Sequence, residues 1–271
     1  MSSELTPEEK LFCKLAIKYN ILSRVQIKEC LRRKKLENVS KPLAIFLIEK
    51  GFLTDEKLDE IISIHEKNLQ AFLTRAYQYQ SSRDFEKATL DFTRVIKSNP
   101  YHTEAFLNRG NAYLGLKQYE NALEDFTSAI ELDPDNAAAY TNRGVTYNHI
   151  GETAKAIEDF TQAISIAPDY PKAYYSRGVA FHFSKEYEKA IQDYTDAIEL
   201  DDEIADAYNN RGVIYTLFKK YDLAIADWEQ ALEIDPQFTS VKLNLQVLKR
   251  RREILAQQQE QEQKQENTNK S

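Results

Sequence analysis

Aromatic and small residues recur at a fixed spacing through the middle of the chain. An aromatic, a small and a second aromatic residue stand at positions i, i+4 and i+7, and this trio returns every thirty-four residues. Its small members are Ala76, Gly110, Gly144, Gly178 and Gly212. Because this spacing places all three side chains on one face of a helix, it predicts an amphipathic helix in each period. The small residue on that face lets a second helix approach closely.

A second amphipathic pattern follows within the same period. In the third period, Ala156, Phe160 and Ala163 again stand at i, i+4 and i+7. A short polar turn such as Lys117-Gln118 separates the two patterns. A proline, which cannot continue a helix, follows the second pattern in four of the five periods. The sequence therefore predicts five helix–turn–helix repeats and an all-α fold class.

This pattern resembles the tetratricopeptide repeat. It covers five repeats, at residues 69–102, 103–136, 137–170, 171–204 and 205–238. The resemblance implies a right-handed solenoid of helix pairs, in which the first helices line a concave groove that binds peptides. Two positions depart from the pattern, because Ala76 replaces glycine in the first repeat and Asp202 replaces proline in the fourth.

Residues 1–68 show a different, twofold pattern. Asn20 and Ser23 are echoed thirty-one residues later by Gly51 and Thr54, in similar apolar surroundings. Asn20 and Gly51 suit the left-handed turn that ends a helix, and Ser23 and Thr54 suit the cap that begins the next one. We therefore expect a small four-helix domain before the repeats.

This N-terminal domain is similar to small helical domains of type II secretion and type IV pilus ATPases. Some of those domains bind cyclic di-GMP through an Arg-Leu-Gly triplet in each half. The matching triplets here, at 11–13 and 42–44, read Leu-Phe-Cys and Pro-Leu-Ala, without the arginine or the glycine. The resemblance implies an alternative function, a ligand-responsive adaptor whose N-terminal domain binds a nucleotide or a secretion or pilus component.

The chain continues beyond the repeats. Apolar Val241, Leu245 and Leu248 predict an amphipathic capping helix at residues 237–256, which would cover the last apolar surface of such an array. A basic run from Lys249 to Arg252 suits the solvated face of that helix. Residues 257–271 are rich in glutamine and have nothing to bury, so we expect a disordered tail or a fraying extension of the helix.

Charge and composition narrow the classes of function. The formal net charge is −7, and residues 69–236 hold 28 acidic against 16 basic residues, which disfavours nucleic acid and anionic membranes as partners. No apolar run is long enough to span a membrane, and the polar start lacks the apolar centre of a signal peptide. Cys13 and Cys30 occupy apolar helical positions, as buried, reduced thiols do, so we expect a cytoplasmic protein.

Motifs for catalysis are absent from the sequence. It contains none of the glycine-rich phosphate loops, metalloprotease helices, nucleophile elbows or paired Cys-x-x-Cys motifs that mark common enzyme and metal sites. His149 and His182 could share a face, but the pattern gives them no carboxylate or thiol to complete a metal site. We therefore expect a non-enzymatic protein with no cofactor and no metal.

An arginine precedes the small residue of every first helix, and an aspartate stands beside the large ring of every second helix. The arginines are Arg75, Arg109, Arg143, Arg177 and Arg211, and the aspartates are Asp91, Asp125, Asp159, Asp193 and Asp227. Because arginine is rarely buried without a partner, we expect five Arg–Asp pairs, within or between repeats. Their strict repetition favours a structural role over a binding role.

A row of side chains on the predicted first helices is turned away from the packing face. The candidate peptide-binding residues are Asn108, Asn111, Asn142, Lys172, Tyr175, Ser176, Phe183, Asn209 and Asn210. An asparagine amide offers two donors and an acceptor, so a row of them can pair with the backbone of an extended peptide. The row resembles the asparagine ladder in the repeat array of O-GlcNAc transferase. The alternative is that these side chains only solvate an exposed face.

These patterns favour a scaffold or adaptor that binds an extended segment of a protein or peptide partner in the concave groove. The family's carboxylate clamp for chaperone tails is not matched, because Lys172 is the only cation in the predicted row. The acidic repeats favour a basic or neutral partner. Self-association through the convex face or the terminal helix is a further alternative.

Overall fold

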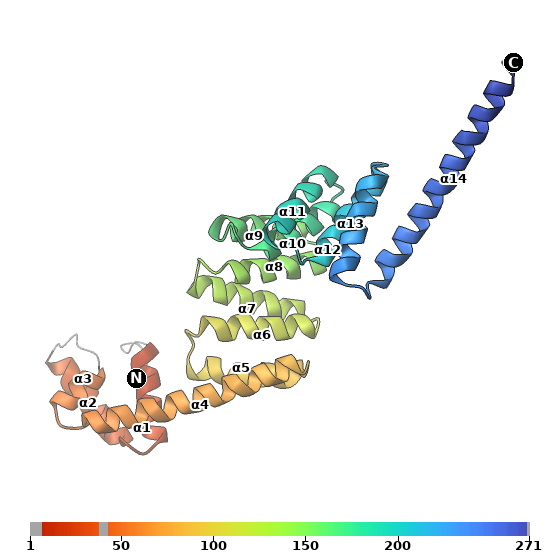
Figure 1. Ribbon diagram of the computed structural model, residues 1–271. Coiled ribbons are helices and arrows are strands. Elements are labelled where there is room, and N and C mark those ends of the chain that lie inside the picture. The colour runs from red at the N-terminus through yellow and green to blue at the C-terminus, as the bar shows by residue number, and fades with distance from the viewer. Residues whose placement is uncertain (1–6, 38–42, 270–271) are drawn as a thin grey trace. The chain divides into compact units, whose positions relative to one another are not determined.

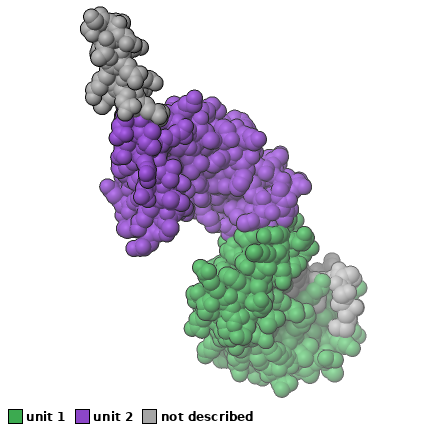
Figure 2. All heavy atoms as spheres, turned by 90° about the vertical axis from the view of Figure 1, so that its right-hand side faces the viewer, with its two compact units in different colours: residues 1–132 green, residues 133–271 purple. Residues whose placement is uncertain are grey.

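The computed structural model describes residues 7–37 and 43–269, and every regular element in these ranges is a helix (Figure 1). The predicted all-α fold is confirmed for this part of the chain. Residues 1–132 form one compact unit, unit 1, and residues 133–271 form a second, unit 2 (Figure 2). Among the described helices, none combines the length and the apolar character needed to cross a membrane.

Unit 1 begins with the N-terminal helical domain. Its helices are α1 (Pro7–Lys18), α2 (Arg24–Leu36), α3 (Leu43–Glu49) and the first half of α4 (Asp55–Ser81). The buried core that they share consists of Ala16, Leu22, Ile27, Cys30, Leu43, Phe46, Leu47, Leu53 and Ile61. Residues 1–6 and 38–42 of the expected domain lie outside the described residues.

The turns of this domain form as the sequence predicts. Asn20 and Gly51 take the left-handed conformation, with φ of 56° and 69°. The side chain of Ser23 accepts a hydrogen bond from the backbone N–H of Gln26 at the start of α2. Thr54 caps α4 in the same way. The two short signals that repeat after thirty-one residues are therefore confirmed as helix ends and helix starts.

Helix α4 joins the N-terminal domain to the first repeat without a break. It runs for 27 residues, so its first half is the fourth helix of the domain and its second half is the first helix of the first repeat. No glycine or proline stands within it, and most of its residues are good helix formers. The boundary that the sequence pattern places between residues 68 and 69 therefore falls inside one continuous helix.

The remaining helices form pairs. In unit 1 these helices are α5 (Phe85–Ser98), α6 (Thr103–Gly115) and α7 (Tyr119–Leu132). In unit 2 they are α8 (Ala137–His149), α9 (Thr153–Ile166), α10 (Pro171–Phe183), α11 (Tyr187–Leu200), α12 (Ala205–Leu217) and α13 (Tyr221–Ile234), followed by α14 (Thr239–Asn269). The second half of α4 pairs with α5, and the next pairs are α6 with α7, α8 with α9, α10 with α11 and α12 with α13.

The small residue of each first helix explains the close approach of its partner. A Cβ atom added to Gly144 of α8 would lie 2.7 Å from the ring of Phe160 in α9, which is closer than packed atoms can approach. The corresponding ring of every second helix is buried, as the pattern predicts. These rings are Phe92, Phe126, Phe160, Tyr194 and Trp228. Burial of one large ring against one glycine is therefore the packing unit that repeats.

Helix α14 packs on the end of the array and is longer than the sequence suggests. Val241 and Leu248 are buried in a cluster with Trp228 of α13, as expected of a capping helix. The helix continues to Asn269, beyond the end expected near residue 256, which agrees with the helical alternative for the tail. Glutamine, glutamate and lysine are good helix formers, so this segment can stay helical without an apolar face to bury. Residues 270–271 lie outside the described residues.

Candidate functional site

Each of the five predicted arginines is paired with an aspartate of its own repeat. In every pair Nε and Nη2 of the arginine donate to the two carboxylate oxygens, and the distance from Nη2 to Oδ1 is 2.7 or 2.8 Å. The prediction of five Arg–Asp pairs is therefore confirmed, with every pair inside one repeat. Because guanidinium and carboxylate meet through two parallel hydrogen bonds, each pair fixes the register between the first and second helix.

The direction of the pKa shift of the carboxylates changes along the array. Burial raises the pKa of Asp125, Asp193 and Asp227, and the hydrogen bonds from their arginines only partly offset this effect. In the first repeat the hydrogen bond from Arg75 lowers the pKa of Asp91 instead, helped by a second arginine, Arg94. The difference arises because Arg75 is half-exposed, whereas the later arginines are mostly covered.

A third hydrogen bond links consecutive repeats. Nη1 of Arg177 donates to the hydroxyl of Thr161 in the preceding second helix, at 3.2 Å. Arg211 donates to Thr195 in the same way, at 2.9 Å. The guanidinium carbon of Arg177 also lies 5.9 Å from the ring centres of both Tyr174 and Phe181. Nε, Nη1 and Nη2 of these arginines each donate a hydrogen bond within the protein, and aromatic rings lie near the guanidinium. The arginines therefore have a structural role.

The candidate peptide-binding residues of unit 2 lie on three neighbouring first helices. Nζ of Lys172 in α10 donates to Oδ1 of Asn142 in α8, at 3.0 Å. Nδ2 of Asn210 in α12 donates to the hydroxyl of Tyr175 in α10, at 3.4 Å. These contacts join the residues into one surface. We call it the first-helix face, and it comprises Asn142, Lys172, Tyr175, Ser176, Phe183, Asn209 and Asn210.

The residues of this face differ in accessibility. Asn142 and Ser176 are buried, so little of either side chain can reach a ligand. Tyr175 is half-buried with its ring 6.0 Å from that of Tyr194, and burial raises its pKa. Phe183, at the end of α10, is 76% exposed. The face therefore offers exposed apolar surface at one end and partly covered polar groups in the middle.

Two asparagines of α12 stand side by side on this face. Nδ2 of Asn209 donates to Oδ1 of Asn210 at 3.1 Å, and both side chains are half-exposed. The indole N–H of Trp228 donates to the backbone oxygen of Asn209, at 3.3 Å. The buried tryptophan therefore holds the backbone that carries the pair. Lys172 also lies on this face, and partial burial of its ammonium lowers its pKa.

The other two candidate residues belong to unit 1. Asn108 lies on α6, and its Nδ2 donates to the backbone oxygen of Glu104 in the same helix, at 2.9 Å. Asn111 is half-buried one turn further on. Glu104 also accepts a hydrogen bond from the hydroxyl of Tyr77 in α4, at 2.6 Å. This part of the predicted row is thus bound to its own helix and to a neighbouring one.

The N-terminal triplets take part in packing. Phe12 and Cys13 lie against the core of the domain, and Leu43 is buried in it. Burial raises the pKa of Cys13 to about 11. Pro42 lies outside the described residues. The described positions of the two triplets therefore offer apolar side chains and no cation for a phosphate.

Sequence reasoning missed several residues on the first helices. Asp206 stands one repeat after Lys172, and Leu217, which is 54% exposed, stands one repeat after Phe183. The thirty-four-residue period itself would have found both. No group of His, Cys, Asp and Glu side chains within the described ranges could hold a metal ion.

Comparison with known proteins decides the family. The family model of the tetratricopeptide repeat matches residues 103–136, 137–170, 171–203 and 205–238. The chain is a tetratricopeptide repeat protein. Proteins with these repeats generally act as non-enzymatic scaffolds, and the repeats here are a protein–protein interaction module. No curated protein matches the sequence significantly.

Several solved tetratricopeptide repeat structures resemble the chain. MamA is 27% identical and has a TM-score of 0.53, with 61% of this chain and 96% of MamA covered. A tetratricopeptide repeat protein from Thermus thermophilus is 21% identical with a TM-score of 0.57, over 66% of this chain and 98% of that one. YrrB, described as having an unusual peptide-binding site, is 18% identical with a TM-score of 0.50, over 64% and 89%. The last two show the fold alone.

The first tetratricopeptide repeat of the pattern lies outside the family match but has the same local structure. Ala76 replaces the glycine, and it is fully buried in the cluster that contains Phe92. Arg75 and Asp91 form the same two hydrogen bonds as the later pairs. The helix pair therefore tolerates one extra methyl group at this position.

Proposed function

We propose that unit 2 binds an extended segment of a protein partner on the first-helix face. The observation that carries the proposal is the exposed ring of Phe183 beside a row of amide groups. Isolated apolar side chains are common on surfaces, but Phe183 and Leu217 occupy equivalent positions of neighbouring first helices. Two such side chains next to polar groups are typical of a site with apolar anchors and a polar surround.

The polar groups suit an extended backbone. The amides of Asn209 and Asn210 bond to each other and to Tyr175, and each keeps unused donor or acceptor capacity. A peptide could exchange these long contacts for hydrogen bonds to its own N–H and C=O groups. Because such bonds do not depend on the side chains of the peptide, apolar anchors such as Phe183 would supply the selectivity.

The accessible residues carry the contacts in this proposal. Tyr175, Phe183, Asn209 and Asn210 present atoms to solvent, whereas Asn142 and Ser176 are buried. Asn142 keeps the ammonium of Lys172 in place through its amide oxygen. The adaptor role follows from this division, because the repeats provide a rigid frame and the first helices provide the contacts.

A peptide library tests the proposal on the full chain. Three first helices about 10 Å apart span about 20 Å, which corresponds to roughly six extended residues, so displayed random peptides of about twelve residues suffice. We expect enrichment on the wild type, and at least tenfold weaker binding of the enriched peptides to the double variant Asn210→Ala, Phe183→Ser. Leu90→Ser is the control, since it removes an exposed apolar residue from a second helix of unit 1. Absence of enrichment, or equal binding by the double variant, would refute the proposal.

A further inference from the structure

Helix α14 continues the register of the first helices. Leu243, Asn244 and Val247 stand thirty-four residues after Asn209, Asn210 and Val213. The buried side of α14 packs on α13 through Val241 and Leu248, as a following first helix would. In sequence register and in packing, α14 therefore takes the place of the first helix of a sixth repeat. No second helix follows it within the described residues.

The opposite side of α14 carries an uncovered apolar stripe. Leu243 is 60% exposed, Val247 is 59% exposed and Ile254 is 47% exposed. Their spacing of i, i+4 and i+11 places them on one side of the helix. A helix that only caps an array needs a polar outer surface. Leu243 and Val247 instead stand at the positions of Asn209 and Val213 in α12, so two members of the stripe continue the side of α12 that carries the first-helix face.

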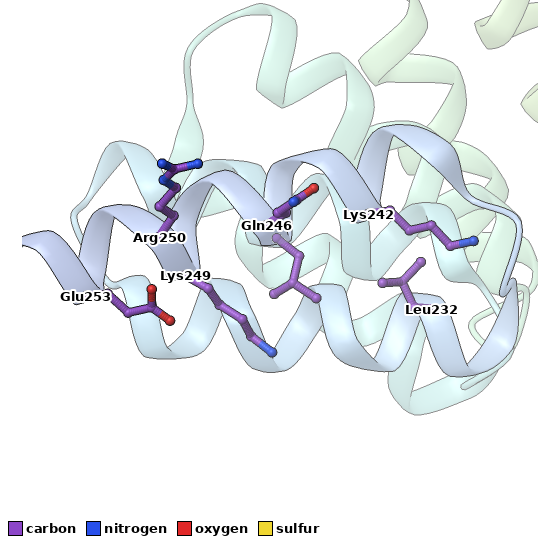
Figure 3. Close-up of a pocket in the computed structure, with 7 residues that line it drawn as sticks. Leu232, Lys242, Gln246, Lys249, Arg250 and Glu253 are labelled. Carbon is purple, nitrogen blue, oxygen red and sulfur yellow. The ribbon is translucent and has the colours of Figure 1, made fainter.

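A hollow between α13 and α14 shows why the array ends here (Figure 3). It is lined by Leu232 of α13 and, on α14, by Lys242, Leu245, Gln246, Lys249, Arg250 and Glu253. Of these, Lys242, Gln246 and Lys249 stand where earlier first helices carry an aromatic, a glycine and a second aromatic against the second helix. Because these side chains are polar, a sixth second helix would have no apolar surface on α14 to pack against. The hollow therefore lies on the side that a sixth second helix would cover, and Leu243, Val247 and Ile254 are not among its lining residues.

The basic residues of α14 differ in whether they have an acidic partner. Lys249 is bound to Glu229 at 2.5 Å and Arg252 to Asp222 at 2.7 Å, both on α13. Arg250 and Arg251 are exposed, and within the described part of the chain neither has an acidic partner. They occupy the positions that correspond to Thr216 and Leu217 of α12, next to the apolar stripe. Two uncompensated cations therefore border the exposed leucine and valine.

These cations reverse the sign of the surface relative to the repeats as a whole. Residues 69–236 are strongly acidic, which favours a basic or neutral partner. On the first helices of unit 2 and on α14, however, the charges near these positions are Lys172, Arg250 and Arg251 against Asp206 and Glu253. The acidic side chains of unit 2 stand mainly on the second helices and in the loops. Charge complementarity at the first-helix positions thus favours an acidic segment.

We propose that the first-helix face extends onto α14, and that it takes an acidic, leucine-rich or similarly apolar peptide segment. An apolar side chain of the segment packs on Leu243 and Val247, and carboxylates of the segment meet Arg250 and Arg251. Asn244 continues the row of amides toward this end. The inference rests on the proposed function of unit 2 and assigns the chemical class of its partner.

The same library of random peptides of about twelve residues tests this inference on the full chain. The wild type should enrich peptides that carry both acidic and apolar residues. The variant Arg250→Glu, Arg251→Glu should bind these peptides at least tenfold more weakly and enrich neutral or basic peptides instead. The matched control is Lys242→Glu, Lys249→Glu, which makes the same change of charge at the positions that correspond to Tyr208 and Tyr215 of α12 and should keep the wild-type selection.

A second variant separates the apolar contribution. Leu243→Ser, Val247→Ser should weaken the enriched acidic peptides by about tenfold, while circular dichroism reports an unchanged helix content, because both side chains are exposed. Enrichment of basic peptides by the wild type, or equal selection by the Arg250→Glu, Arg251→Glu variant and its control, would overturn the inference.

The two proposals fail in different ways. If peptides are enriched and are lost with Asn210→Ala, Phe183→Ser but not with any α14 variant, the first-helix face binds and its extension is wrong. If nothing is enriched, the proposed function itself fails and this inference fails with it.

Discussion

Arg177 donates two hydrogen bonds to Asp193, each of 2.8 Å, and so ties the first helix of its repeat to the second. The carboxylate is buried and the guanidinium is mostly covered. Because Arg177 also bonds to Thr161 of the preceding repeat, one side chain sets both the angle within a repeat and the stacking on its neighbour. The array is therefore held by a polar ladder as well as by apolar packing.

Removal of one carboxylate from this ladder should cost stability in proportion to the burial of the arginine that it leaves behind. Asp193→Ala leaves the covered Arg177 without its acceptor, and we expect a loss of about 2–3 kcal/mol in the free energy of unfolding. Asp91→Ala in the first repeat should cost roughly 1 kcal/mol, because water can reach the half-exposed Arg75. Urea unfolding followed by circular dichroism measures both. Equal losses in the free energy of unfolding for the two variants would show that burial of the arginine does not set the cost.

The glycine of the repeat can be tested where the approach is closest. Gly144→Ala places a methyl group 2.7 Å from the ring of Phe160, so we expect destabilisation by about 1–3 kcal/mol. The double variant Gly144→Ala, Phe160→Leu removes the colliding ring and should show a favourable coupling between the two sites. Thermal unfolding of the two single variants and the double variant gives this coupling. Strict additivity of the two losses would show that the methyl group and the ring do not meet.

The two thiols should be unreactive in the folded protein. Burial raises the pKa of Cys13 to about 11 and raises that of Cys30 as well. At pH 8 almost no thiolate forms, so a disulfide-exchange reagent should react slowly with the native chain and with two thiols after denaturation. Because both folded pKa values lie above those of the free thiol, the stabilising effect is full below about pH 9 and is lost as the pH rises toward 11. Rapid labelling of native protein at pH 8 would contradict the burial.

The polar side of α14 should prevent further stacking. The triple variant Lys242→Tyr, Gln246→Gly, Lys249→Tyr copies the packing residues of α12 onto this side, where no second helix covers them in the described part of the chain. We expect the variant to self-associate as its concentration rises, since an exposed apolar face seeks another surface. Sedimentation velocity over a range of concentrations measures the effect against the wild type. If the variant sediments as the wild type does, the polar residues on this side of α14 do not prevent stacking.

The sequence predicts the repeats well because each one reuses a single packing solution. One ring, one glycine and one Arg–Asp pair recur at fixed positions, so any one repeat is evidence for the others. The end of the array is harder to predict for the same reason. At Lys242, Gln246 and Lys249 the packing residues are replaced, and the period becomes visible only through Asn244 and Val247 on another side of the helix.

The exposure of individual side chains at the candidate site cannot be predicted from the sequence pattern. Asn142, Ser176 and Asn210 occupy equivalent positions, yet the first two are buried and the third is half-exposed. Their exposure depends on the neighbours that each repeat supplies, such as Lys172 beside Asn142. Periodicity locates a side of a helix, whereas the bulk of adjacent side chains decides what reaches the solvent.

The unbroken α4 has a mechanical consequence. A helix transmits rotation along its axis, and α4 belongs to the core of the N-terminal domain at one end and to the first repeat at the other. No flexible linker lies between them in which a displacement could dissipate, since every residue from Asp55 to Ser81 is helical. A rotation of the N-terminal domain about the axis of α4 therefore also rotates the first repeat, because both contain part of the same helix.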